Sequence, residues 1–166
     1  MFEKNSVFES ERLLFRGIRA EDAENLVRWR SREDVYRYSN VPEPITLPEH
    51  LLWFEKYLTR SQEIRAIIAY KAKNKDIGMV GGVIEDGVFV ISYYIGEPEY
   101  RGKGLAGEAI GALIEFVLSQ TEITAVHAYV LKDNAASISC LSKIGFKLLR
   151  RGEATDLYEC IQRKGI

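Results

Sequence analysis

An almost uninterrupted apolar run, VFVISYYI at residues 88–95, constrains the fold of this chain more than any other segment. Such a run is typical of a strand that is buried on both faces, in the interior of a sheet. Asp86 and Gly87 stand directly before it, and this dipeptide favours a tight hairpin with a preceding strand at 77–84. The segment GEPEYRGKG follows, and helical spacing begins after it. We therefore expect a central strand that leads through a tight loop into a helix.

The other segments alternate between the periods typical of helices and strands. The sequence Thr46-Leu47-Pro48-Glu49 is a capping box, and it begins a helix whose core face carries Leu47, Leu51, Phe54 and Leu58. The order β-α-α-β-β-β-α-β-α-β-β predicts an α/β fold, a mixed sheet with helices on both faces. Strands are expected at 12–18, 63–71, 77–84, 88–95, 125–131, 146–150 and 155–161, and helices at 22–30, 46–58, 104–119 and 134–144.

Composition excludes several classes of protein. The 166 residues carry a net charge of -1, with Lys and Arg spread along the chain, so no nucleic-acid partner is expected. No apolar run approaches the ~20 residues that span a bilayer, and the charged N-terminus does not suit a secretory signal. Cys140 and Cys160 lack the spacing of metal ligands. We expect a cytoplasmic protein with two reduced thiols, no metal and no membrane partner.

The segment Arg101-Gly102-Lys103-Gly104 is predicted to bind a phosphate group. It enters a helix, and the first turn of a helix has unpaired N–H groups that attract phosphate. Gly102 and Gly104 permit a sharp turn and a close approach to the backbone, while Arg101 and Lys103 add positive charge. The alternative is a turn that only connects strand and helix. A Walker loop is absent, and the short dinucleotide pattern at 102–107 follows a hairpin, which disfavours hydride transfer.

The chain resembles the Gcn5-related N-acetyltransferases. Arg101-Gly102-Lys103-Gly104-Leu105-Ala106 is similar to the signature [QR]-x-x-G-x-[GA] of that family. Asn134-Ala135-Ala136-Ser137, ending in Lys143-Ile144-Gly145-Phe146, is similar to its N-x-x-S…GF block. The order of elements also agrees, so the resemblance covers nearly the whole chain. It implies one acetyltransferase domain at 1–166, with a mostly antiparallel central sheet, that transfers acetyl from acetyl-CoA to a primary amine by direct attack.

The resemblance also implies where acetyl-CoA binds. In the family, the strand before the loop splays from its neighbour, and its main-chain groups bond the pantetheine arm as they would an added strand. Asn134 matches a residue that bonds the pantetheine, although Asn is also among the best helix N-caps, and the two roles are compatible. The expected coenzyme-binding residues are Tyr94, Ile95, Gly96, Arg101, Gly102, Lys103, Gly104, Leu105, Ala106, Asn134 and Ser137.

Acetyl transfer requires a group that takes a proton from the amine and a donor for the departing thiolate. Many family members place a Tyr donor at the position of Leu141, so here the usual acid is missing. The resemblance implies Ser137 as the catalytic donor, with a helix cap or a coenzyme contact as the alternatives. The strand at 88–92 carries no carboxylate, and the base remains open between Tyr93, Glu153, Asp156 and a water relay.

The acceptor amine is expected to bind the N-terminal third of the chain. Arg12-Leu13-Leu14 and Asp22 resemble the ribosomal-protein N-terminal acetyltransferases. The W-R pair, the loop with Pro42 and Pro44, and the sequence E-H-x-x-W-F resemble enzymes that acetylate amino-sugar nucleotides. The acceptor is accordingly a small-molecule or peptide amine. The expected substrate-binding residues are Trp29, Arg30, His50 and Trp53, although core packing would also account for the aromatic ones.

Two alternatives concern catalysis and assembly. Leu141 and the absence of a strand carboxylate favour a non-catalytic sensor that only binds acyl-coenzyme A. The closing strand at 155–161 alternates apolar and polar residues, as at the edge of a sheet. Because an edge strand can pair with a second subunit, a homodimer is expected.

Overall fold

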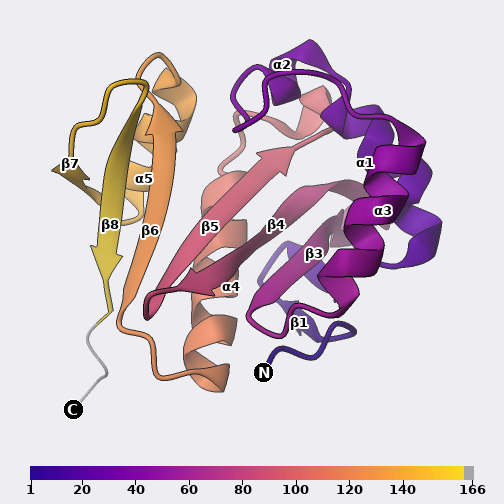
Figure 1. The fold of residues 1–166 in the computed structure, drawn as a ribbon, viewed down its shortest axis with the longest axis horizontal. Coiled ribbons are helices and arrows are strands. Elements are labelled where there is room, and N and C mark those ends of the chain that lie inside the picture. Colours follow the sequence, from indigo (N-terminus) through magenta and orange to yellow (C-terminus); the bar gives the residue numbers. More distant parts are fainter. Residues whose placement is uncertain (163–166) are drawn as a thin grey trace.

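A computed structural model describes residues 1–162 of the chain, and its helices and strands follow the predicted order (Figure 1). Short 3-10 turns stand at Ala20–Asp22, Lys71–Lys73 and Pro98–Tyr100. The strands are β1 Val7–Glu9, β2 Leu13–Gly17, β3 Glu63–Tyr70, β4 Lys75–Glu85, β5 Val88–Ile95, β6 Ala125–Leu131, β7 Lys147–Arg150 and β8 Thr155–Ile161. The helices are α1 Ala23–Arg30, α2 Glu33–Tyr36, α3 Leu47–Leu58, α4 Leu105–Gln120 and α5 Ala135–Lys143.

The strands of the described chain form one 8-stranded sheet in the order β1-β2-β3-β4-β5-β6-β8-β7. β5 and β6 pair in parallel, and the other neighbours pair antiparallel. The predicted mixed, mostly antiparallel sheet is thus confirmed. β1 and α2 were not predicted, because segments of 3 and 4 residues are too short to show a period.

Helices cover both faces of the sheet, as predicted. α1 and α3 lie on one face, over β3 and β4, while α4 and α5 cover the other (Figure 1). The predicted inward side of α4 is confirmed, since Leu105, Ala109, Leu113 and Val117 are buried in the main core. A smaller cluster on the opposite face contains Leu26 and Trp29 of α1, packed with residues of α3.

The turn and cap predictions are confirmed. Asp86 and Gly87 have φ of 50° and 78°, as the two central residues of a type I′ hairpin do. Thr46 caps α3, and its hydroxyl accepts from Glu49 N at 3.3 Å. Asn134 caps α5, and Gly145 follows that helix with φ of 102°.

The predicted core face of α3 is wrong. Leu47, Leu51 and Leu58 are exposed, whereas His50 and Tyr57 are buried. Tyr57 occupies the inner side because its hydroxyl accepts a hydrogen bond from Arg65 N of β3, at 2.8 Å. At this position, burying a tyrosine ring whose hydroxyl is hydrogen-bonded stabilises the fold more than burying a flexible leucine.

Two predictions about strands are also wrong. β5 is not buried throughout: Phe89, Ile91 and Ile95 are buried, but Ser92 is exposed. β8 is not an edge strand, because it lies between β6 and β7, and the short, exposed β7 forms the edge. The homodimer was expected because residues 155–161 were predicted to form an edge strand, so that reason for expecting a homodimer no longer holds.

Within residues 1–162, no helix combines the length and the apolar character that crossing a bilayer requires. Cys140 and Cys160 are both free thiols, as predicted.

Replacing Gly96 by Ala should destabilise the fold. An added Cβ would lie 2.3 Å from Cγ of the fully buried Trp29. Overpacking of this kind costs about 1–3 kcal/mol. Gly111→Ala is the control, because no atom lies within 4 Å of a Cβ at that helical position. It should stabilise α4 by up to about 1 kcal/mol. Urea denaturation measures both changes, and equal stabilities would contradict the packing argument.

Candidate functional site

A cleft of about 1470 Å³ opens where β5 and β6 diverge. The two strands pair only at Phe89 with Val126 and at Val90 with His127. Beyond these pairs they separate toward their carboxyl ends, with β6 on one side and β4 still bonded to β5 on the other (Figure 1). Both Ile91–Ile95 and Ala128–Val130 line the cleft. The divergence leaves main-chain groups on the inner edge of β5 without a strand partner.

The alternation of antiparallel hydrogen bonds identifies those main-chain groups. Gly96 N donates to Ile77 O at 2.7 Å, so this pair bonds across the β4–β5 ladder. Because bonded and non-bonded pairs alternate along the ladder, Tyr94 also bonds to β4, whereas Tyr93 and Ile95 direct their N–H and C=O groups toward the cleft. Tyr94 and Gly96 thus bond toward β4, while the main-chain groups of Tyr93 and the N–H of Ile95 face the cleft; the Ile95 carbonyl accepts from Arg101 Nε at 2.8 Å.

The predicted phosphate loop lies at one end of this cleft. Gly102 and Gly104 have φ of 73° and 75°, conformations that favour glycine. No atom lies within 4 Å of a Cβ built on Gly102, so its backbone faces open space. The first helical bond of α4 runs from Glu108 N to Gly104 O, 3.2 Å, so the three N–H groups before Glu108 lack helical partners. Unpaired N–H groups of this kind are suited to bind a phosphate.

The two basic side chains of the loop do not take the positions that were expected. Arg101 Nε donates to Ile95 O at 2.8 Å, and its Nη1 donates to Asp34 of α2 at 2.7 Å. Hydrogen bonds from Arg101 lower the pKa of Asp34 to about 2. Lys103 lies outside the cleft lining, with Nζ 5.6 Å from the Tyr100 ring centre. Arg101 thus fastens the loop to β5 and α2 and is not a mobile charge.

A second arginine, Arg12, supports the loop from the position directly before β2. Arg12 donates through Nη1 to Lys103 O at 3.0 Å and through Nε to Glu108 Oε1 at 2.7 Å. Glu108 also accepts from Ser10 Oγ at 2.6 Å. Sequence reasoning did not identify Arg12 or Glu108 as supports, since nothing local in either segment indicates a partner in the other.

Two hydroxyls meet inside the cleft. Tyr93 of β5 and Ser137 of α5 share a hydrogen bond. Asn134 caps α5 through Oδ1, which accepts from Ser137 N at 3.3 Å, and this cap holds the first turn of α5 beside β5. Burial raises the pKa of Tyr93 to about 12, so its phenol remains protonated at neutral pH. The position of the missing family Tyr, Leu141, is fully buried in the core.

Of the residues left open as the base, only Tyr93 lines the cleft, and His50, which was not among them, lines it too. Asp156 is engaged by Lys132, and neither it nor the exposed Glu153 lines the cleft. Tyr93 lines the cleft, but its raised pKa makes it a donor. His50 lines the cleft as well, and burial lowers its pKa from 6.5, so its imidazole is neutral at pH 7.

The other half of the cleft lies between the N-terminal elements and the sheet. Arg30, His50 and Trp53, expected at the acceptor site, all line it. Trp29 does not: it is fully buried, and its indole N–H donates to Glu97 Oε1 at 2.9 Å. The segment that contains Pro42 and Pro44 contributes a wall through Tyr38, Ser39, Asn40, Val41 and Ile45. No cluster of three potential metal ligands occurs among the described residues.

Comparison with known families gives one match, which spans most of the chain. The family described as "Acetyltransferase (GNAT) domain" matches residues 12–147. The uncharacterized N-acetyltransferase p20 of Bacillus licheniformis is 29% identical over 164 residues, which cover 90% of this chain and 91% of that protein. An uncharacterized protein of Methanocaldococcus jannaschii is 26% identical over 165 residues. That alignment covers 96% of this chain but only 33% of the longer relative.

Solved structures share the fold. AAC(6')-Ib in complex with ribostamycin and coenzyme A has a TM-score of 0.80 at 18% identity, with 91% of this chain and 94% of that chain covered. Ribosomal-protein-S5-alanine acetyltransferase from Vibrio fischeri has a TM-score of 0.75 at 20% identity, with 95% and 97% covered. Both of these acetyltransferases therefore have the same fold as this chain.

Replacing Asp34 by Asn should loosen α2 without unfolding the protein. The Arg101–Asp34 pair is partly exposed, so its loss should cost less than about 1 kcal/mol of global stability. Amide hydrogen exchange should nevertheless accelerate in α2. Glu33→Gln, which neutralises the exposed neighbouring carboxylate, is the control and should leave exchange unchanged.

The same contact has a defined pH range. Because the pKa of Asp34 is depressed from 3.8 to about 2, its contribution is complete above pH 3.8 and is lost as the pH falls through about 2. Protection of α2 that decreased between pH 7 and pH 5 would contradict this assignment.

Proposed function

The chain belongs to the GNAT family of acetyltransferases, and from this premise we propose that it transfers the acetyl group of acetyl-CoA to a primary amine. The observation that carries the proposal is the meeting of two features in one cleft. The open edge of β5 and the unpaired N–H groups of α4 both border it. Coenzyme A requires both features, because it has an extended pantetheine arm that ends in a diphosphate.

The residues fit coenzyme A along its length. The N–H groups at 105–107 bind the diphosphate, assisted by the positive end of the α4 dipole. The pantetheine arm lies along β5 and bonds the main-chain groups of Tyr93 and the N–H of Ile95, whose carbonyl already accepts from Arg101. Asn134 and Ser137 border the arm from α5. The thioester consequently lies beside the Tyr93 and Ser137 hydroxyls.

The amine attacks the thioester carbonyl carbon, the C–S bond breaks, and the thiolate leaves. Tyr93, supported by Ser137, donates a hydrogen bond to that departing sulfur. A thiol has a pKa of about 8.5, below that of Tyr93, so the phenol stabilises the thiolate without surrendering its proton completely. The hydroxyl pair thereby replaces the acid that Leu141 cannot provide.

The attacking amine must also lose a proton. With a pKa of about 10, an alkyl amine is mostly protonated at pH 7. His50 is neutral there because burial lowers its pKa, and it borders the acceptor half of the cleft. We propose that His50 accepts this proton, either directly or through a water molecule.

The acceptor class is proposed from the family resemblances and from the neighbours. A protein N-terminus is one candidate, in line with the S5-alanine acetyltransferase of Vibrio fischeri. An amino sugar is the other, in line with the aminoglycoside complex of AAC(6')-Ib. Release of free thiol from acetyl-CoA, measured with a panel of peptide amines and UDP-amino sugars, decides between them. Coenzyme binding without thiol release from any amine would instead support the non-catalytic sensor.

Gly104→Val should abolish coenzyme binding without unfolding the domain. A branched residue at φ of 75° strains the loop by about 1–2 kcal/mol, which is relieved by moving the N–H groups that hold the diphosphate. Nothing but Arg12 lies within 4 Å of the added Cβ, so the core is not overpacked. Thermal shift with acetyl-CoA measures the loss.

Gly87→Val is the matched control for this strain. Its φ is 78°, no atom lies near its Cβ, and the hairpin is remote from the loop. It should retain the thermal shift of the wild type. A normal shift in Gly104→Val would show that the diphosphate binds elsewhere.

Tyr93→Phe and Ser137→Ala should each lower kcat by about 10–100-fold, somewhat less than full general acid catalysis contributes. Coenzyme affinity should change little, because each variant removes only a hydroxyl. The double variant should be no slower than Tyr93→Phe, since the two groups act as one unit. Ser142→Ala, an exposed serine of α5 outside the cleft, should match the wild type. Unaltered turnover in both single variants would remove the pair from the mechanism.

A further inference from the structure

One guanidinium group in the acceptor half of the cleft lacks a partner. Arg30 stands at the end of α1 and lines the cleft, and its Nη1 atom is buried with no hydrogen-bond partner among residues 1–162. A buried charged donor without a partner is costly, and native structures usually satisfy one with a ligand, an ion or water. Among the described residues, Nη1 of Arg30 and Nη2 of Arg101 are the two such atoms, and Arg30 is the one that belongs to the acceptor half.

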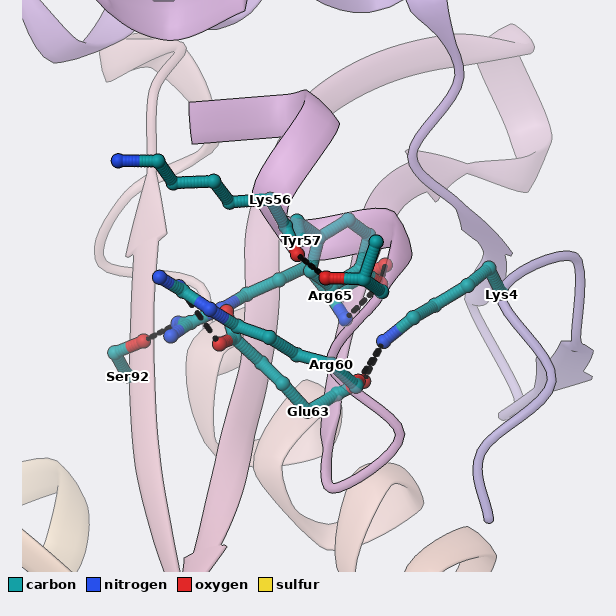
Figure 2. Close-up of polar contacts among 8 residues, drawn as sticks. Lys4, Lys56, Tyr57, Arg60, Glu63, Arg65 and Ser92 are labelled. Carbon is teal, nitrogen blue, oxygen red and sulfur yellow. Dashed lines mark hydrogen bonds and ion pairs between the residues drawn. The ribbon is translucent and has the colours of Figure 1, made fainter. Parts of the chain in front are cut away.

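A second arginine borders the same half of the cleft from β3. Arg65 donates through Nε to Glu63 at 3.0 Å and through Nη1 to Ser92 of β5. Figure 2 shows that Arg65 reaches across the sheet toward Ser92. These contacts hold the guanidinium at the cleft wall, where its charge acts on the space that Arg30 also borders.

Glu63 does not neutralise this region. Its carboxylate contacts Arg60 at 3.5 Å as well as Arg65, while the ammonium of Lys4 donates to the Glu63 backbone carbonyl (Figure 2). Two guanidinium groups thus share one buried carboxylate. Positive charge remains in excess beside the cleft.

The carboxylates nearer the cleft are engaged elsewhere. Asp34 binds Arg101 and Arg32, and Glu49 completes the capping box with Thr46. Asp22, on the far side of His50, is held by Arg16 at 2.8 Å. The acceptor half therefore offers a positive, partly desolvated surface between Arg30 and Arg65, beside the rings of Trp53 and Tyr94.

We propose that the amine acceptor carries an oxyanion, a carboxylate or a phosphate, which Arg30 binds directly and Arg65 attracts. This inference rests on the proposed function, because it names the class of amine that the same site accepts. A guanidinium suits both oxyanions, since its parallel N–H groups match either one in a bidentate contact. A neutral amine leaves Nη1 of Arg30 unsatisfied.

Matched pairs of amines test the proposal through thiol release. Glucosamine 6-phosphate with glucosamine probes phosphate, and leucine with leucinamide probes carboxylate. For at least one pair, the wild type should show a kcat/KM about 10–100-fold higher for the anionic member, the value of one charge-assisted hydrogen bond. The pair that responds identifies the oxyanion. Equal kcat/KM within both pairs would overturn the proposal while leaving the acetyltransferase activity established.

Variants assign the preference to Arg30. In Arg30→Gln, the kcat/KM of the anionic member should fall to that of its neutral partner, while the Kd of coenzyme A stays unchanged. Arg30→Lys should restore part of the difference, because it keeps the charge but not the bidentate geometry. Arg150→Gln, which removes an exposed charge from β7, should match the wild type. A fall of both members together in Arg30→Gln, with a lower Tm, would indicate a merely structural role.

A binding measurement separates this proposal from the proposed function. Titration calorimetry measures the Kd of each amine for protein that is saturated with coenzyme A. Because coenzyme A carries no acetyl group, no transfer to the amine can occur. Stronger binding of the anionic member that Arg30→Gln abolishes, without thiol release from acetyl-CoA, would refute the activity and retain the oxyanion site. Binding that is equal for both members, or equal in wild type and Arg30→Gln, would refute the site.

Discussion

Unequal hydrogen bonding on the two sides of β5 is the constraint on which the rest of the structure depends. Toward β4 the strand is paired from Val88 to Ile95, whereas toward β6 its pairing ends at Val90. The opening occurs at the parallel junction, where α4 crosses from one strand to the other. Backbone groups need partners, so the inner edge of β5 must obtain them from a ligand or from water. The topology of the sheet thereby creates a binding edge before any side chain is considered.

Side chains alternate along β5, so neighbouring residues of the strand face opposite sides of the sheet and border different parts of the cleft. Tyr93 points to α5 and meets Ser137, while Tyr94 points to the opposite face, where it meets Trp29. Adjacent residues of one strand thus face the two halves of the cleft that are proposed to release the thiol and to bind the amine. In the proposed reaction, the bond that is exchanged lies between them, at the strand itself. A short displacement of β5 would alter both halves at once.

Sequence periodicity predicted the long, one-sided elements, and it failed where contacts between distant segments decide the outcome. The bounds of β6 and β8 and the cap at Asn134 agree with the structure. The leucines of α3 face outward because a bond from β3 places Tyr57 inside. Gly96, expected to contact the coenzyme, is required for close packing against Trp29. The glycine turn at 102–104 was predictable because its backbone requirement is local, whereas the Tyr93–Ser137 pair joins residues 44 positions apart.

The bond between Arg101 and Asp34 has a consequence for how the two substrates bind. It joins the loop proposed to receive the diphosphate to α2, beside the segment that walls the proposed amine-binding half. A rearrangement at one end that passes through this contact to the other would link the affinities of the two substrates. Thermodynamic reciprocity requires that each substrate change the dissociation constant of the other by the same factor. One ion pair on the rim of the cleft would then set how strongly the binding of the coenzyme and the binding of the amine depend on each other.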